Sequence, residues 1–131
     1  MATHTLRKRE RLCSMKLTDR LFGGAGSQSM AAFPIRVVWM EIERNDEQES
    51  PVQILVSVSK RHFKRAIKRN RVKRQLREAY RVAKQPLYDQ LAATPQRALV
   101  IAFIWLANDL YPSQEIAERM RKLIGRIVEK L

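Results

Sequence analysis

The segment from residue 98 to residue 106, ALVIAFIWL, constrains the fold more than any other part of the chain, because it contains no polar side chain. It is far too short to span a bilayer, which takes about 20 apolar residues. A run of this length with β-branched and aromatic residues predicts a strand. That strand has no polar side for water, so it should be covered on both faces, in the middle of a sheet or beneath a helix. A chain of 131 residues is expected to build one domain around it, with a single core.

Two further strands are expected before this one. Residues 33–43, FPIRVVWMEIE, are β-branched and aromatic with partial alternation, and Pro34 suits the start or the edge of a strand. Residues 52–59, VQILVSVS, form the next candidate. The connection between them, residues 45–51, is short, polar and acidic. So short a connection predicts that these two strands pair as an antiparallel hairpin.

Helices are expected near both ends of the chain. A short one follows the possible cap Ser14 and ends near Phe22, before glycines that adopt left-handed conformations. The last helix follows a Pro112–Ser113 start signal. Its apolar residues recur at a spacing of three and four: Ile116, Met120, Leu123, Ile124, Ile127, Val128 and Leu131. The opposite face carries Arg119, Lys122, Arg126 and Lys130. We interpret this helix as structural, with a membrane or partner-helix role as the alternative.

Positive charge is concentrated between residues 60 and 84. This window holds twelve Lys or Arg residues and one acid, Glu78, which amounts to +11 of the net +13 of the whole chain. Such a concentration attracts a polyanion. A solvated helix face usually mixes signs at i,i+4, whereas here Arg77 follows Lys73 and Arg81 follows Arg77. Each like-charge pair costs a few tenths of a kcal/mol. A bound nucleic acid would remove these penalties.

The same window predicts a helix over residues 66–84 with an apolar back. Five residues fall within an arc of about 100°, which is enough to seat a helix on a sheet. They are Val72, Leu76, Ala79, Tyr80 and Ala83. The residues on the far side are Asn70, Arg71, Lys73, Arg74, Arg77, Arg81 and Lys84. Phe63 and Ile67 lie off the apolar arc, so residues 60–65 are expected to enter the helix through an irregular turn.

RNA is the favoured polyanion. The outward residues are almost all Arg and Lys, which suit phosphates, whereas a helix that reads DNA bases also uses short Asn, Gln or Ser side chains. No zinc spacing, leucine zipper or helix-turn-helix pair is visible. Aromatic residues interleave with the strands and could stack unpaired bases. The alternative for them is core packing, which is favoured for Trp39 and left open for Phe33.

Protein-borne catalysis is not expected. His4 and His62 have no Asp or Cys partner at ligand spacing, and the acids of residues 41–49 lie in a turn that we interpret as solvated. The single cysteine, Cys13, excludes an internal disulfide and leaves no plausible metal cluster. Residues 1–11 form a basic arm that is expected to be flexible and lacks the apolar centre of a secretory signal. The expected compartment is therefore the cytoplasm, without membrane association.

Residues 57–81, SVSKRHFKRAIKRNRVKRQLREAYR, closely resemble the signature of the bacterial ribonuclease P protein subunit. That family is marked by an Arg-Asn-Arg element, here residues 69–71, followed by a hydrophobic residue, Lys-Arg and a Leu-Arg-Glu-Ala tract, here residues 72–79. The Ser-Val-Ser-Lys-Arg-x-Phe lead-in is present at residues 57–63. Looser matches extend the likeness over roughly residues 6–130.

The resemblance implies an α+β fold, a two-layer α/β sandwich of the ribosomal-protein-like type in which the basic helix crosses over in an unusual left-handed connection. It implies a single RNA-binding domain over residues 1–131 that serves ribonuclease P as an accessory subunit. That endoribonuclease removes the 5′ leader of precursor tRNA, and its RNA subunit is the catalyst and holds the Mg²⁺. The implied partners are this RNA subunit and precursor tRNA, with no DNA and no obligate protein partner. The leader is expected in a cleft between the sheet and the basic helix.

The resemblance also assigns two sets of residues by position. The RNA subunit would be bound by Arg65, Lys68, Arg69, Asn70, Arg71, Lys73, Arg74 and Arg77. The leader would be bound by Phe22, Phe33, Arg36, Ser57, Ser59, Lys60 and Arg61. Thr18 and Arg36 stand where relatives carry aromatic residues, so charge is expected to replace part of the stacking. The alternative function is a structural ribosomal or RNA-chaperone protein that uses the same helix.

Overall fold

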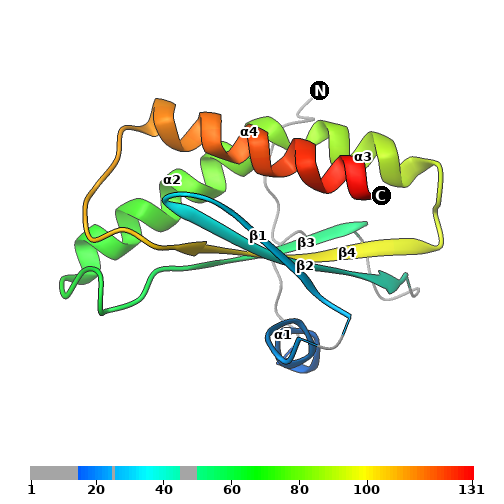
Figure 1. Cartoon of the computed structure of the whole chain (residues 1–131), viewed down its shortest axis with the longest axis horizontal. Coiled ribbons are helices and arrows are strands. Elements are labelled where there is room, and N and C mark those ends of the chain that lie inside the picture. The colour runs from blue at the N-terminus through cyan, green and yellow to red at the C-terminus, as the bar shows by residue number, and fades with distance from the viewer. Residues whose placement is uncertain (1–14, 25, 45–49) are drawn as a thin grey trace.

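The computed structural model describes residues 15–24, 26–44 and 50–131. The expected arm of residues 1–11, Ser14, Cys13 and most of the acidic turn lie outside these residues. Along the described chain the elements are α1 (Met15–Phe22), β1 (Gln28–Ala32), β2 (Ile35–Glu43), β3 (Val52–Ser57), α2 (Ala66–Ala83), α3 (Gln85–Ala92), β4 (Arg97–Trp105) and α4 (Ser113–Lys130). Figure 1 shows α2, α3 and α4 on one face of a four-stranded sheet and α1 on the other. The expected α+β class is confirmed.

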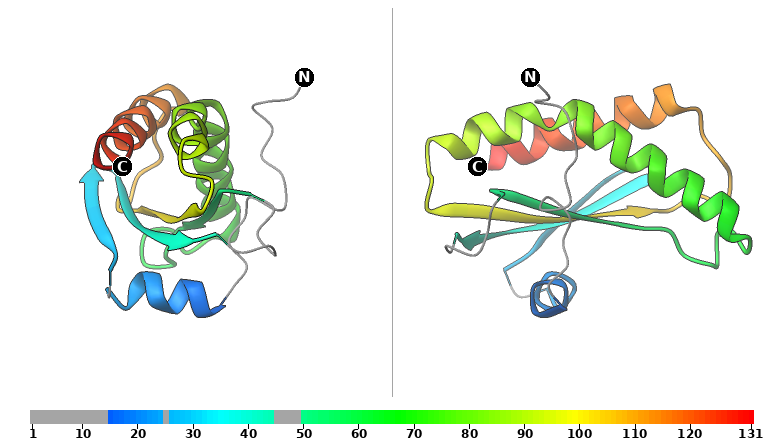
Figure 2. Two further views of the ribbon diagram at one scale, coloured as in Figure 1. Left: turned by 90° about the vertical axis from the view of Figure 1, so that its right-hand side faces the viewer. Right: turned by 180° about the vertical axis from the view of Figure 1, so that it is seen from behind.

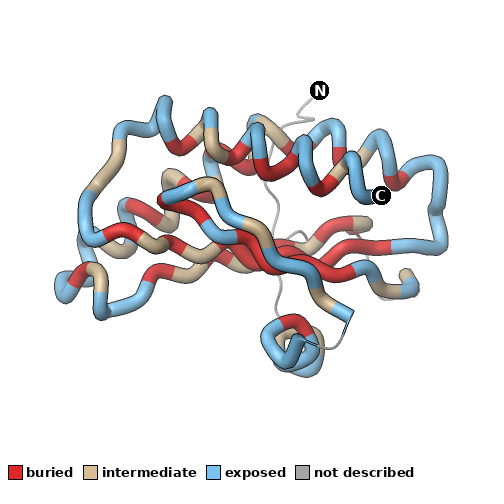
Figure 3. Tube along the Cα trace, in the orientation of Figure 1, coloured by how far each residue is buried: buried red, intermediate tan, exposed pale blue. Residues whose placement is uncertain are grey.

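The sheet has the strand order β1-β2-β4-β3, with β4 inside it. β2 is antiparallel to β4 from Ile35↔Trp105 to Glu43↔Arg97, while β3 runs parallel to β4. The burial expected for the apolar segment is confirmed, since residues 98–103 and Trp105 are all buried. Figure 3 shows this buried stretch running through the centre of the sheet.

The expected hairpin between residues 33–43 and 52–59 is wrong. β4 lies between β2 and β3, because a strand that is apolar on both faces occupies the interior of the sheet, and β3 alternates buried and half-buried residues as an edge strand does. The hairpin in this structure joins β1 to β2 through Phe33 and Pro34. Strand β1 was not predicted, because QSMAA has no β-branched residue and no clear alternation.

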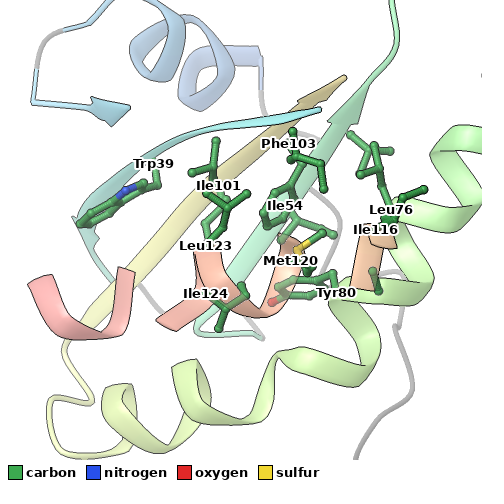
Figure 4. Close-up of a cluster of buried hydrophobic side chains, with 14 of the residues drawn as sticks. Trp39, Ile54, Leu76, Tyr80, Ile101, Phe103, Ile116, Met120, Leu123 and Ile124 are labelled. Carbon is green, nitrogen blue, oxygen red and sulfur yellow. The ribbon is translucent and has the colours of Figure 1, made fainter. Parts of the chain in front are cut away.

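The core has two parts, one on each face of the sheet. The larger one joins the sheet to α2, α3 and α4, and Figure 4 shows Leu76 and Tyr80 of α2 beside Ile116 and Met120 of α4. The smaller one lies under α1, where Leu21 is fully buried among residues of β2 and β4. α3 was not predicted as a separate helix. It begins directly after Lys84, with Pro86 in its first turn, where proline is tolerated.

The chain from β3 to β4 crosses the helical face through α2 and α3. In the end view of Figure 2 (left), both strands point away from the viewer with the helices above them, and β4 lies to the left of β3. The crossover is therefore left-handed, against the usual preference and as the resemblance implies.

Candidate nucleic-acid interface

α2 is held on the sheet by the residues that the helical spacing predicts. Val72, Leu76, Ala79 and Tyr80 are all buried, and Val72, Leu76 and Tyr80 are wholly inaccessible to solvent. Residues 60–65 form turns and bends ahead of the helix, so the irregular entry is confirmed. With its back fixed in this way, α2 can turn only its other side outward.

The outward side of α2 carries the residues that the resemblance assigns to the RNA subunit. We call this set the basic ridge, and its exposed members are Arg65, Lys68, Asn70, Arg71 and Arg74. Its half-buried members are Arg69, Lys73 and Arg77. None of them belongs to the buried stripe of the helix. A row of long cationic side chains on a rigid helix can contact several phosphates at once.

Glu78, the one acid of α2, is paired within the helix. Arg81 donates from Nε to its Oε2 at 3.0 Å, and Arg81 Nη2 also contacts Oε1. The hydrogen bond from Arg81 lowers the pKa of Glu78 below its ordinary value of 4.5. Glu78 therefore stays ionised at neutral pH and offsets one cation that is not in the basic ridge.

Arg69 has a structural contact that sequence analysis did not predict. Its Nη1 donates to the backbone oxygens of Phe63 and Lys64, at 2.8 Å each. These carbonyls lie in the turn just before the helix, and Arg65 at the N-cap provides no side-chain cap. The bond to Phe63 is partly buried, where a backbone carbonyl needs a partner, whereas the bond to Lys64 is exposed. Arg69 therefore joins the first turn of α2 to the segment that leads into it.

The turn before α2 is fixed at further points. Ser59 Oγ accepts from the backbone N–H of Arg61 at 3.1 Å, and His62 Nδ1 lies 2.7 Å from Asn108 Oδ1 in the loop after β4. Phe63 is buried in the main core. Of the residues assigned to the leader, Ser59, Lys60 and Arg61 lie in this turn and are exposed. They border the basic ridge along the chain.

Two other residues assigned to the leader, Arg36 and Ser57, lie in one row across the sheet. Arg36 of β2 and Ser57 of β3 both pair with Ile104 of β4. Paired residues point to the same face, which here is the face that carries α1. Arg36 is exposed, and its Nε donates to Ser29 Oγ at 3.0 Å.

Between α2 and the sheet, the described residues form packed core rather than the open cleft that the resemblance implies. The space between α2 and the sheet is filled by the main core, from Val56 and Phe103 to Leu76 and Tyr80. Arg36 and Ser57 lie on the opposite face, beside the part that α1 covers. The physical reason is the apolar arc of α2, which leaves no polar surface to line a cleft on that side.

Phe22 and Phe33 are exposed but do not share one location. Phe22 ends α1 and is 47% exposed. Phe33 lies in the β1–β2 turn and is 58% exposed, and its ring packs edge-on against Tyr111 on the helical side, with centroids 6.4 Å apart. Thr18 is half-buried on α1. The structure thus brings Arg36 and Ser57 together and places Phe33 apart from them.

Gln75 is a further residue that sequence analysis missed. Its Nε2 donates to the backbone oxygen of Tyr111 at 3.2 Å and to Ser113 Oγ at 3.0 Å, which ties α2 to the start of α4. No sequence pattern distinguishes it from an ordinary surface glutamine.

Neither a metal-binding cluster nor a membrane-spanning helix is found among the described residues. They contain no group of three or more His, Cys, Asp or Glu side chains that could hold a metal ion. Among the same residues, no helix combines the length and the apolar character that a membrane span requires.

Comparisons with known proteins point to one family. The family model for ribonuclease P matches residues 6–128. A ribonuclease P protein component from Porphyromonas gingivalis strain ATCC 33277 is 36% identical over 126 residues, covering 96% of this chain and 88% of the relative. One from Chlorobium phaeobacteroides is 36% identical over 134 residues, covering 98% and 88%. In fold, the chain is similar to the RNase P protein from Thermotoga maritima, with a TM-score of 0.63 at 18% identity over 89% of this chain and 96% of the other.

Proposed function

Because this chain belongs to the ribonuclease P protein family, and is therefore a protein subunit of ribonuclease P, we propose that it binds the catalytic RNA subunit through the basic ridge of α2. The observation that carries this proposal is the division of α2 into two sides. Its apolar side is buried in the core, and its outward side presents cations with Asn70 among them. A helix fixed in this way pays little entropy on binding, because its backbone is already ordered.

We further propose that the unpaired 5′ leader of precursor tRNA lies on the α1 side of the sheet. The row of Arg36, Ile104 and Ser57 offers a cation, an apolar floor and a hydroxyl. Lys60 and Arg61 follow from the end of β3 and would meet the backbone of the same strand. In this arrangement the protein contacts the leader and the RNA subunit at the same time.

In this proposal the RNA subunit removes the leader from precursor tRNA and holds the Mg²⁺, and the protein supplies binding and orientation in the cytoplasm. The protein holds the leader and the catalytic RNA in one fixed relative position. This lowers the activation barrier, because the substrate loses translational and rotational freedom on binding rather than in the reaction step. Phosphate contacts supply the affinity, which should fall as salt rises.

The test compares precursor tRNA with mature tRNA. In the presence of a catalytic RNA subunit at low Mg²⁺, the wild-type chain should tighten binding of precursor tRNA more than binding of mature tRNA. Equal affinity for the two would overturn the leader proposal and favour a ribosomal or RNA-chaperone type of role for the same helix.

Arg71→Ala should weaken assembly of the protein with the RNA subunit. Its control is Arg97→Ala, which removes one positive charge at the start of β4, where Arg97 pairs with Glu41 at 2.7 Å. If both variants weaken assembly equally, net charge rather than the basic ridge determines the affinity.

A further inference from the structure

Phe33 is an exposed aromatic ring that the fold holds in place. It lies at the tip of the β1–β2 hairpin, and 58% of the residue is exposed. One side is supported by Tyr111, whose ring in turn packs edge-on against the buried Trp105, with centroids 5.5 Å apart. The backbone of Tyr111 is fixed by Gln75 of α2. A largely exposed ring that neighbouring rings hold in place is suited to stacking.

Arginine side chains of α4 lie along the same hairpin. Arg119 Nε donates to the backbone oxygen of Phe33 at 3.0 Å, and Arg126 Nη1 donates to that of Ala31 at 3.4 Å. Lys122 is exposed on the same flank of the helix, between the two arginines. A guanidinium has five N–H donors, so the bond to Phe33 leaves most donors of Arg119 for an outside acceptor. The ring and a positioned cation therefore occur side by side.

Acidic groups of α4 limit the positive potential here. Glu118 Oε2 lies 3.8 Å from Arg119 Nη1, and Glu115 and Glu129 are exposed on the same helix. Charge alone would give weak, non-selective attraction to a polyanion. The ring is consequently the part of this surface that favours an unpaired strand over a duplex, since only an unstacked base can lie on it.

We propose that Phe33, Arg119 and Lys122 form a second contact for an unpaired RNA strand, in which a base stacks on Phe33 and the adjoining phosphates meet the two cations. The contact lies on the helical side of the sheet, away from the face that carries Arg36 and Ser57. Figure 1 shows the hairpin tip beneath α4, toward the end of the molecule at which α2 begins. The inference deepens the proposed function, because the strand is either the precursor leader or an unpaired segment of the RNA subunit.

The test uses the full chain and two probes, a ten-nucleotide single-stranded oligouridylate and an RNA duplex of the same length. Phe33→Leu should weaken oligouridylate binding about 5- to 100-fold, the range that corresponds to the loss of one stacked base. Phe33→Trp should restore it, and binding should quench the added indole. Duplex binding should change little. Val82→Ala, at an exposed residue of α2, controls for loss of apolar surface.

A second set of measurements, made with the RNA subunit present, identifies which RNA supplies the unpaired strand. A Phe33→Leu defect confined to precursor tRNA with a leader identifies the leader, and a defect in assembly itself identifies the RNA subunit. The inference is overturned if Phe33→Leu binds oligouridylate as the wild type does, or loses single-strand and duplex binding equally. A folding defect in Phe33→Leu would be recognised by a lower melting temperature of that variant. Phe33→Trp should keep the melting temperature of the wild type. Failure here leaves the Arg71→Ala assembly result unaffected, so the two proposals fail separately.

Discussion

Adjacent residues of the Arg-Asn-Arg element have different surroundings, which the sequence does not reveal. Arg69 is half-buried and donates to two backbone oxygens of the preceding turn, whereas Asn70 and Arg71 are exposed. The sequence identifies all three as one motif, because they share polarity and position. It cannot tell which of them also holds the fold, since that depends on where the carbonyls of Phe63 and Lys64 point after an irregular turn.

Arg69→Ala should therefore destabilise the protein more than Arg71→Ala. Loss of two charge-assisted hydrogen bonds at a half-buried site is expected to cost about 1–2 kcal/mol, while the exposed Arg71→Ala should stay within about 0.5 kcal/mol. Urea unfolding of the two variants measures the difference. Both should impair RNA binding, Arg69→Ala in part through a loosened turn.

The control at this position is Arg69→Lys, which retains the charge but cannot reach two carbonyls with one planar group. We expect it to bind RNA better than Arg69→Ala while remaining less stable than the wild type. Equal unfolding free energies for all four proteins would show that the contacts of Arg69 contribute nothing to stability.

At the level of the element, α2 was the most predictable part of the chain. The apolar arc predicted which side is buried, and the charge pattern predicted which side faces outward, except for Lys84, which is buried at the end of the helix. The strand pairing was less predictable, because local connection length favoured a β2–β3 hairpin, while burial of β4 on both faces decided the actual order. β1 and α3 were missed since neither QSMAA nor QPLYDQLA has a strong periodic pattern. The space between α2 and the sheet, where a cleft was expected, is filled by the main core for a related reason: the face of the sheet that α2 covers follows from tertiary packing.

Glu78→Gln should increase the salt dependence of RNA binding. Glu78 pairs with Arg81 on α2 and remains ionised above its lowered pKa. Without that carboxylate, Arg81 can contact one more phosphate, which adds about 0.7–0.9 to the magnitude of the slope of log K against log salt. Titrations of RNA binding at several salt concentrations measure this slope.

Stability should change little in this variant, because the pair lies at the surface, with the Glu78 side chain 61% and the Arg81 side chain 34% exposed. The sign of the small effect follows from the lowered pKa of Glu78: the pair stabilises the fold above the ordinary pKa and the contribution disappears as the pH falls through the lowered one. An unchanged salt slope would mean that Arg81 faces no phosphate in the complex.

In the whole molecule, β4 is the strand that joins β1 and β2 to β3 in one sheet. It pairs with β2 on one side and β3 on the other, and both of its faces are buried. Strand β1, by contrast, lies at an edge of the sheet, and most of its residues are exposed.

Amide hydrogen exchange should therefore be slowest in β4, at a level set by global unfolding, and much faster in β1. Exchange measured residue by residue on the free protein tests this order. Similar protection of β1 and β4 would indicate that the sheet opens as one unit and that edge position has no influence.

The central place of β4 also matters while the chain is being made. β2 and β3 do not pair with each other, and the strand that joins them follows α2 and α3 in the sequence. A ribosome releases the chain from its N-terminus, so the cationic helix α2 leaves the exit tunnel before β4 can complete the sheet on which the helix packs. During that interval the nascent helix has no complete sheet to pack on and lies close to ribosomal RNA, so translation itself exposes this polypeptide to a nucleic acid other than its own.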